Sequence, residues 1–201
     1  MKLKLLCSVS ALLFSTVLWA MPQIGQAAPD FSLVDSKGQR HNLKDFAGKT
    51  VVLEWTNHDC PFVKKHYQGN MQALQKEFTA KADTVWLSII SSAPGKQGYV
   101  SPEQADQLTQ SRGAMPTAVL FDESGVVGKA YDAKTTPHMY VIDAKGLLQY
   151  MGGIDSIPST KVEDIPKATP WFADAASAVL AGEAAKPAVS KPYGCSIKYA
   201  D

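Results

Sequence analysis

Cys60 is the residue whose type and surroundings are best suited to chemistry. It stands between Asp59 and Pro61, after the apolar run 50–55 (TVVLEW) and before a basic, helix-like segment. The run predicts a buried strand, and Pro61 suits the first position of a helix because its missing N–H costs nothing there. The free N–H groups at a helix start favour a thiolate, so we expect the pKa of Cys60 to lie below its free value of about 8.5.

A thiolate attacks disulfides and peroxides, so this placement points to thiol redox chemistry. Lys64 adds positive charge one turn along, whereas Asp59 opposes it. The alternative is an inert cysteine in an apolar pocket. Ligand sites of α/β proteins usually lie where a strand ends and a helix begins, which favours the reactive interpretation.

The first twenty residues predict a secretory signal. Lys2 and Lys4 precede an apolar run over 5–20 that is short for a membrane-spanning helix. The cleavage boundary near residue 20 is not sharp, because Leu18 is a poor match to the small-residue rule. An uncleaved membrane anchor is the alternative, but the run is too short to favour it.

The predicted export decides which cysteines the mature chain retains. The chain has 3 cysteines, and Cys7 falls in the signal and is expected to leave with it. A periplasmic or secreted mature chain then keeps Cys60 and Cys195. An even pair in an exported protein suggests a disulfide, either permanent or reversible.

Periodicity along the chain predicts one α/β domain. A chain of 201 residues with net charge +1 can build a single core and has no bulk attraction to nucleic acid or to an anionic membrane. Alternating strand and helix signals predict a sheet with helices on both faces, and a closing antiparallel pair makes it mixed. The expected elements are a hairpin over 30–43, strands at 50–55, 84–90, 117–121, 138–143 and 147–151, and helices at 62–78, from 102, up to 131 and at 168–182.

Three histidines are further candidates. His58, His66 and His138 could share a side with Cys60, and a Cys/His cluster suits copper or zinc. The spacing matches no strong ligand pattern, so we expect no metal or other cofactor. His138 is a candidate proton donor to the sulfur, whereas Lys64 and Lys65 are predicted to lie on a solvated helix face.

Five stretches together resemble a thioredoxin-fold redoxin of the peroxiredoxin-like group, the alkyl hydroperoxide reductase/thiol-specific antioxidant type. The resemblance covers much of the mature chain and rests on the order of its parts. They are 25–31 (GQAAPDF), 43–53 (LKDFAGKTVVL), Cys60 itself, 130–137 (AYDAKTTP) with the following strand, and 193–198 (YGCSIK).

The resemblance implies a thioredoxin-like fold with a central mixed sheet flanked by helices and an N-terminal β-hairpin extension. It also implies that Thr136, Pro137 and His138 border Cys60. We expect a signal over 1–20, a thioredoxin-like domain over 21–182 and an irregular C-terminal tail over 183–201 that carries Cys195.

Departures from the family pattern limit what the resemblance implies. Thioredoxins carry Cys-x-x-Cys, but Val63 occupies the second cysteine position, which is also where the peroxidatic cysteine of true peroxiredoxins aligns. Thr56 and Cys60 stand where those enzymes carry a proline and a threonine. Cys60 therefore needs a partner from elsewhere.

We expect a thiol oxidoreductase in which Cys60 attacks and Cys195 resolves. Its substrates would be hydroperoxides or protein disulfides, and its electron donor a thiol/disulfide protein or a small thiol. A bridge closing so long a loop would stabilise the fold by about 4–5 kcal/mol on the chain-entropy model. The alternative is a redox-inactive or metal-binding module with a structural Cys60–Cys195 disulfide.

Overall fold

The computed structural model describes residues 21–200. The predicted signal over 1–20, and Cys7 with it, lies outside the described residues. Within the described part, no helix is long and apolar enough to cross a membrane.

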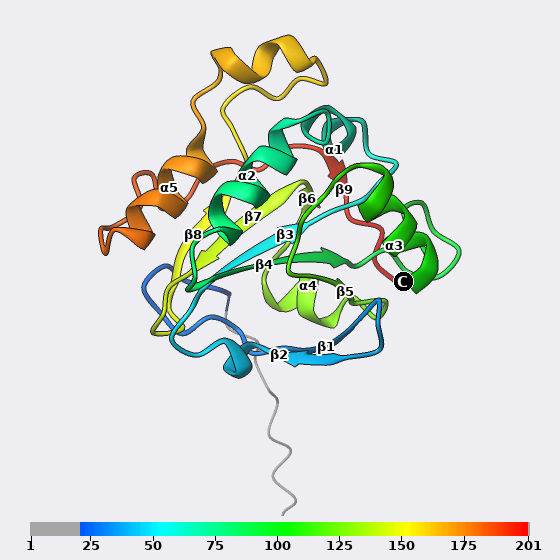
Figure 1. Ribbon diagram of the computed structural model, residues 1–201, viewed down its shortest axis with the longest axis horizontal. Helices are drawn as coiled ribbons and strands as arrows, with labels where there is room; N and C mark the ends of the chain where they lie inside the picture. The colour runs from blue at the N-terminus through cyan, green and yellow to red at the C-terminus, as the bar shows by residue number, and fades with distance from the viewer. Residues whose placement is uncertain (1–20, 201) are drawn as a thin grey trace, which may run out of the picture.

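A seven-stranded mixed sheet forms the centre of the molecule (Figure 1). Its strand order is β2-β1-β5-β4-β3-β7-β8, with β3, β4 and β5 parallel and the remaining pairs antiparallel. The predicted mixed sheet and N-terminal hairpin are therefore confirmed. The strands are β1 (Ser32–Asp35), β2 (Arg40–Asn42), β3 (Thr50–Trp55), β4 (Thr84–Ile90), β5 (Ala118–Phe121), β7 (His138–Ile142) and β8 (Leu148–Gly152).

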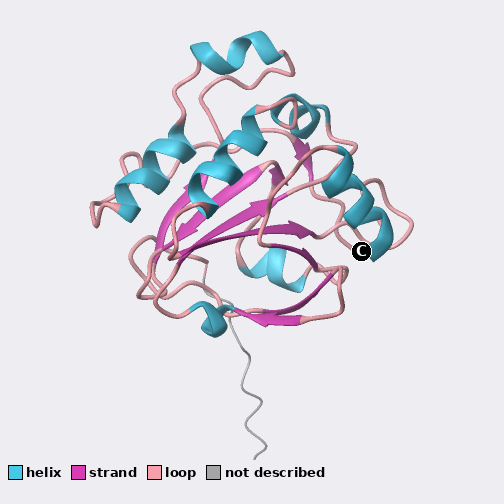
Figure 2. Ribbon diagram, in the orientation of Figure 1, coloured by secondary structure: helices cyan, strands magenta, loops and turns pink. Residues whose placement is uncertain are grey.

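Helices cover both faces of the sheet (Figure 2). On one face, Phe172 packs edge-on against Trp86 and Phe78, with ring centroids 5.3 and 5.7 Å apart. On the other, Trp55 and Tyr140 pack at 5.0 Å. The helices are α1 (Pro61–His66), α2 (Asn70–Thr79), α3 (Pro102–Ser111), α4 (Val126–Ala130) and α5 (Trp171–Leu180), with 3-10 turns η1 (Leu43–Phe46) and η2 (Val162–Lys167).

The helix predicted over 62–78 is two helices, so that prediction was wrong in detail. α1 ends at His66 and α2 begins at Asn70, and between them Gly69 adopts φ 117°. This is a backbone region that residues with a Cβ rarely enter, so glycine permits the break. The break shortens α1 to the six residues that directly follow Cys60.

The C-terminal tail was predicted to be irregular, but it contains a short strand. β9 (Cys195–Ser196) pairs antiparallel with β6 (Thr135–Thr136), and Cys195 lies directly opposite Thr136. Figure 1 shows the red tail passing beside α1 and β6. The pairing therefore places Cys195, which lies near the C-terminus, against the loop that precedes β7.

A buried carboxylate organises the sheet beneath α2. Glu54 on β3 is 0% exposed and accepts hydrogen bonds from Trp86 Nε1 at 2.9 Å, Ser88 Oγ at 2.9 Å and Tyr67 Oη at 2.9 Å. Gln75 Nε2 donates at 3.3 Å. These four donors satisfy the carboxylate, as buried polar groups need hydrogen-bond partners, and no cation among residues 21–200 pairs with it.

We predict that Glu54→Leu lowers the free energy of unfolding by about 3 kcal/mol or more, because several buried donors lose their acceptor together. Glu54→Gln keeps the shape and one carbonyl oxygen, so its loss should be smaller. Urea denaturation measures both. Equal stability of the leucine variant and the parent would contradict this role for the carboxylate.

Candidate redox site

Cys60 lies at the end of the loop that follows β3, as the N-cap of α1. Its side chain is 0% exposed. The thiol donates to the Thr136 carbonyl oxygen at 3.1 Å, and the backbone N–H of Cys195 donates to the Cys60 sulfur at 3.4 Å. The structure thus brings Cys60, Thr136 and Cys195 together, and both cysteines are free thiols.

The loop before β7 supplies the other side of the site. The Thr136–Pro137 peptide bond is cis, and Thr136 is 2% exposed. Its carbonyl oxygen contacts Cys60, so the structure places this residue beside the sulfur as the resemblance implied.

His138 points elsewhere. Its Nδ1 lies 3.1 Å from Tyr140 Oη and accepts from the Lys134 N–H at 3.3 Å. Burial, with a smaller contribution from Lys134, lowers the pKa of His138 to about 3. The ring is therefore neutral at pH 7, and its hydrogen bonds at Nδ1 go to Tyr140 and the β6 loop rather than to Cys60.

The pKa values of the two thiols are shifted in opposite directions. Burial alone would raise the pKa of Cys60, but hydrogen bonds from the Cys195 side chain and from the backbone N–H groups of Val63 and Cys195 outweigh it, and the net pKa lies below the ordinary value. Burial and the hydrogen bond to Cys60 raise the pKa of Cys195 to about 11. The pair can therefore hold one thiolate on Cys60 and one thiol on Cys195, as a charge-assisted hydrogen bond.

Gly194 permits the close approach of the tail. It adopts φ 139°, and a Cβ at this position would overlap the Thr136 carbonyl oxygen. Only glycine can therefore bring the backbone of residue 194 against the β6 loop while Cys195 faces Cys60.

Tyr193 anchors the tail on its other side. Its hydroxyl donates to Asp155 Oδ1 and lies 3.1 Å from His66 Nε2, and its ring packs edge-on against Phe62 at 5.6 Å. Burial lowers the pKa of His66 to about 4, although Asp155 opposes the shift. The neutral His66 imidazole and the Asp155 carboxylate can therefore both hydrogen-bond to the Tyr193 hydroxyl.

Lys65 was predicted to lie on a solvated face, and this is wrong. Its side chain is 0% exposed, and Nζ lies 3.6 Å from Asp155 Oδ2 and 3.4 Å from the Ile157 carbonyl oxygen. The loop between β8 and η2 supplies both of these partners and so covers the end of the Lys65 side chain. Only Lys64 of the pair is exposed, 3.9 Å from Asp59.

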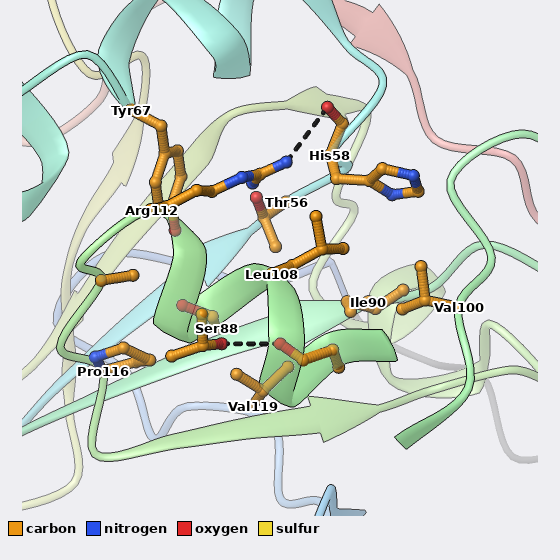
Figure 3. A pocket seen from close by; sticks show the side chains of 13 residues that line it. Thr56, His58, Tyr67, Ser88, Ile90, Val100, Leu108, Arg112, Pro116 and Val119 are labelled. Atoms are coloured by element: carbon orange, nitrogen blue, oxygen red, sulfur yellow. Dashed lines mark hydrogen bonds between the residues drawn. The ribbon is translucent and has the colours of Figure 1, made fainter. Parts of the chain in front are cut away.

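His58 lies away from the cysteine pair. It lines a cavity of about 40 Å³ beneath α3, whose lining does not include Cys60. In Figure 3, Arg112 donates to the His58 carbonyl oxygen, at 3.3 Å. Over residues 21–200 the structure contains no group of three or more His, Cys, Asp or Glu side chains placed to hold a metal ion.

Two functional contacts were missed from sequence alone. Tyr193 is two residues before Cys195 in the stretch YGCSIK, and this closeness in sequence could have identified it. Asp155 gave no signal, because it lies in a loop with no motif around it.

A thioredoxin-like sheet with a buried, acidic cysteine beside a cis-proline loop defines a thioredoxin-fold redoxin. The model of the AhpC/TSA family matches residues 24–151, and the chain belongs to this family.

Relatives and solved structures agree with this class. The chain is 29% identical over 127 residues to the thioredoxin-like protein YneN of Bacillus subtilis, covering 63% of this chain and 69% of that protein. It is 28% identical over 148 residues to a thiol peroxidase of Streptococcus parasanguinis, covering 68% and 81%. A crystal structure of an uncharacterized conserved protein from Geobacillus kaustophilus superposes with TM-score 0.72 at 30% identity, covering 90% of this chain and 94% of that one.

We predict that Cys195→Ala moves the titration of Cys60 to higher pH, because the thiolate loses a hydrogen-bond donor. Cys195→Ser keeps an O–H donor and should hold the midpoint low. Thiolate absorbance at 240 nm, measured against pH in a Cys7→Ser background, reports Cys60 alone in both variants. A midpoint that is the same in the alanine and serine variants would show that the Cys195 side chain does not tune Cys60.

We predict that Tyr193→Phe loosens the tail at a cost of about 1–3 kcal/mol, because buried Asp155 loses a donor while the ring packing remains. Hydrogen exchange at the amides of residues 195–198 should become faster. Tyr99→Phe, at an exposed position, is the matched control. Unchanged protection in Tyr193→Phe would mean that the hydroxyl does not hold the tail.

Proposed function

We propose that this protein is an exported thiol–disulfide oxidoreductase whose redox pair is Cys60 and Cys195. The observation that carries the proposal is the β6–β9 pairing, which sets Cys195 against the Cys60 sulfur. A two-electron oxidation joins the two sulfurs and releases two protons, and reduction by a dithiol reverses it. The predicted signal over 1–20 supports a periplasmic or secreted location, where such exchange takes place.

Disulfide exchange fits the site better than peroxide reduction. The position at which true peroxiredoxins carry the peroxidatic cysteine is Val63, an apolar side chain that is 0% exposed. The Cys195 side chain hydrogen-bonds to the Cys60 sulfur, an arrangement suited to exchange between the two sulfurs. We therefore take protein disulfides and dithiols as the substrate class, with a thiol donor or acceptor as the partner.

The proposed activity is tested by reduction of insulin disulfides with dithiothreitol as the electron donor. We predict that the parent accelerates the reduction and that Cys60→Ser and Cys195→Ser each return it to the uncatalysed rate, since either loss removes the pair. Ser196→Ala, next to Cys195 and exposed, is the control and should retain activity.

Hydrogen peroxide consumption under the same conditions distinguishes the two chemistries. Peroxide consumed rapidly with no insulin reduction would contradict disulfide exchange and favour a peroxidase. Neither activity in the parent, with both single variants indistinguishable from it, would instead favour a structural disulfide.

A further inference from the structure

The two sulfurs of the proposed pair differ in how an outside molecule can reach them. Cys60 is 0% exposed, covered by the Thr136 carbonyl group and the backbone of Cys195. Cys195 is partly exposed, and Ser196 after it is exposed. This asymmetry is the reverse of the order expected from the sequence, in which Cys60 meets the substrate and Cys195 resolves.

The direction of attack sharpens this difference. A thiolate attacks a disulfide sulfur in line with the S–S bond, from the side opposite the sulfur that leaves. For attack on Cys60, that side is filled by protein, because the residue has no exposed surface. For attack on Cys195, the approach is from the side away from Cys60, and Cys195 is partly exposed.

Lifting the tail would be a costly way to expose Cys60. Tyr193 is fixed by Asp155 and His66 on one side of Cys195. Three hydrogen bonds fix the other side: Ile197 N–H to Lys134 O at 3.1 Å, Ala93 N–H to Lys198 O at 2.9 Å, and Tyr199 Oη–H to Ala133 O at 2.7 Å. A partner that reacts at Cys195 needs none of these contacts broken.

We propose that Cys195 is the sulfur that forms the mixed disulfide with the partner, and that Cys60 is the inner sulfur released from the pair. The inference rests on the proposed function and assigns its partner-facing residue. The partner is a protein dithiol carried on an exposed segment, because Cys195 is only partly exposed, on a two-residue strand, and the dithiol has to reach it from outside.

The exchange has two steps. One partner thiolate attacks Cys195 Sγ, forming the intermolecular S–S bond and breaking the Cys60–Cys195 bond, and Cys60 leaves as a thiolate. The second partner thiolate attacks the partner's own first sulfur, forming the partner disulfide and releasing Cys195, which takes up a proton. The partner dithiol is oxidised by two electrons and the Cys60–Cys195 disulfide is reduced by two.

Single-cysteine chains test which sulfur is reachable. In a Cys7→Ser background, Cys60→Ser leaves Cys195 and Cys195→Ser leaves Cys60. Each is incubated with glutathione disulfide, and the glutathione adduct is followed by intact-protein mass spectrometry. The rate of each variant in the folded state is divided by its rate in urea, where both thiols are exposed, so that differences in local sequence cancel.

We expect the folded-to-unfolded ratio of the rate per thiolate to be about tenfold or more higher for Cys195 than for Cys60, since at equal thiolate fraction thiol exchange depends on access. A ratio for Cys60 equal to or above that of Cys195 would overturn the inference and leave the proposed function standing. If neither folded variant reacts although both react in urea, the proposed function fails together with the inference.

A second variant tests the tail as the cover over Cys60. Gly194→Ala, added to Cys195→Ser, forces residue 194 away from Thr136, because a Cβ would overlap its carbonyl oxygen. It should raise the rate of Cys60 several-fold. Gly182→Ala is the matched control, because this glycine also has positive φ, 77°, but no atom within 4 Å of an added Cβ. An unchanged Cys60 rate in Gly194→Ala would contradict the tail as the cover over Cys60, although a sulfur that stays protected would still support Cys195 as the partner-facing residue.

Discussion

The site depends on a two-residue strand pairing between segments from distant parts of the chain. β9 lies against β6, with Cys195 opposite Thr136, and this register turns the Cys195 N–H toward the Cys60 sulfur. A shift by one residue would point Cys195 to the opposite face and place Gly194 or Ser196 at the sulfur. Because so short a strand cannot hold its own register, its flanking contacts have to fix it.

Those flanking contacts explain why a lysine, a histidine and an aspartate are buried at α1, the helix that follows Cys60. Asp155 receives the Tyr193 hydroxyl and pairs with Lys65 at 3.6 Å. Charges removed from water are costly, and a buried pair of this kind rarely adds net stability. We infer that the Lys65–Asp155 pair serves to fix the position of Tyr193, and with it the position of the Cys195 thiol two residues later.

The sequence was sufficient for the scaffold and for the placement of Thr136 and Cys195 beside Cys60, but not for His138, which contacts Tyr140 instead. The β-branched runs at 50–55 and 84–90 became β3 and β4 without a change of bounds, because continuous apolar runs fit a strand buried on both faces. Ser101 and Pro102 correctly marked the start of α3, where the Ser101 hydroxyl accepts from the Gln104 N–H at 3.3 Å. The break at Gly69 was missed, because the apolar spacing continues across it.

Tertiary burial was harder to predict. Lys65 follows an exposed lysine on a short helix, and it is removed from water by the loop after β8 and by the Tyr193 ring of the tail, both distant in sequence. The burial of Cys60 has the same origin, since the tail that covers it returns from the end of the chain. The local pattern singled out Cys60 as the candidate residue, whereas the relative exposure of Cys60 and Cys195 depended on contacts across the whole fold.

The central claim is that Cys60 and Cys195 are a reversible redox pair. The most direct test is to equilibrate the protein in glutathione buffers of stepped potential, quench with acid, and map the peptides by mass spectrometry. We predict one Cys60–Cys195 disulfide that appears and disappears reversibly, with the two-electron slope of about 30 mV per tenfold change in ratio. Two free thiols at every potential, or a Cys60 oxidised to sulfinic acid while Cys195 stays a thiol, would contradict the account.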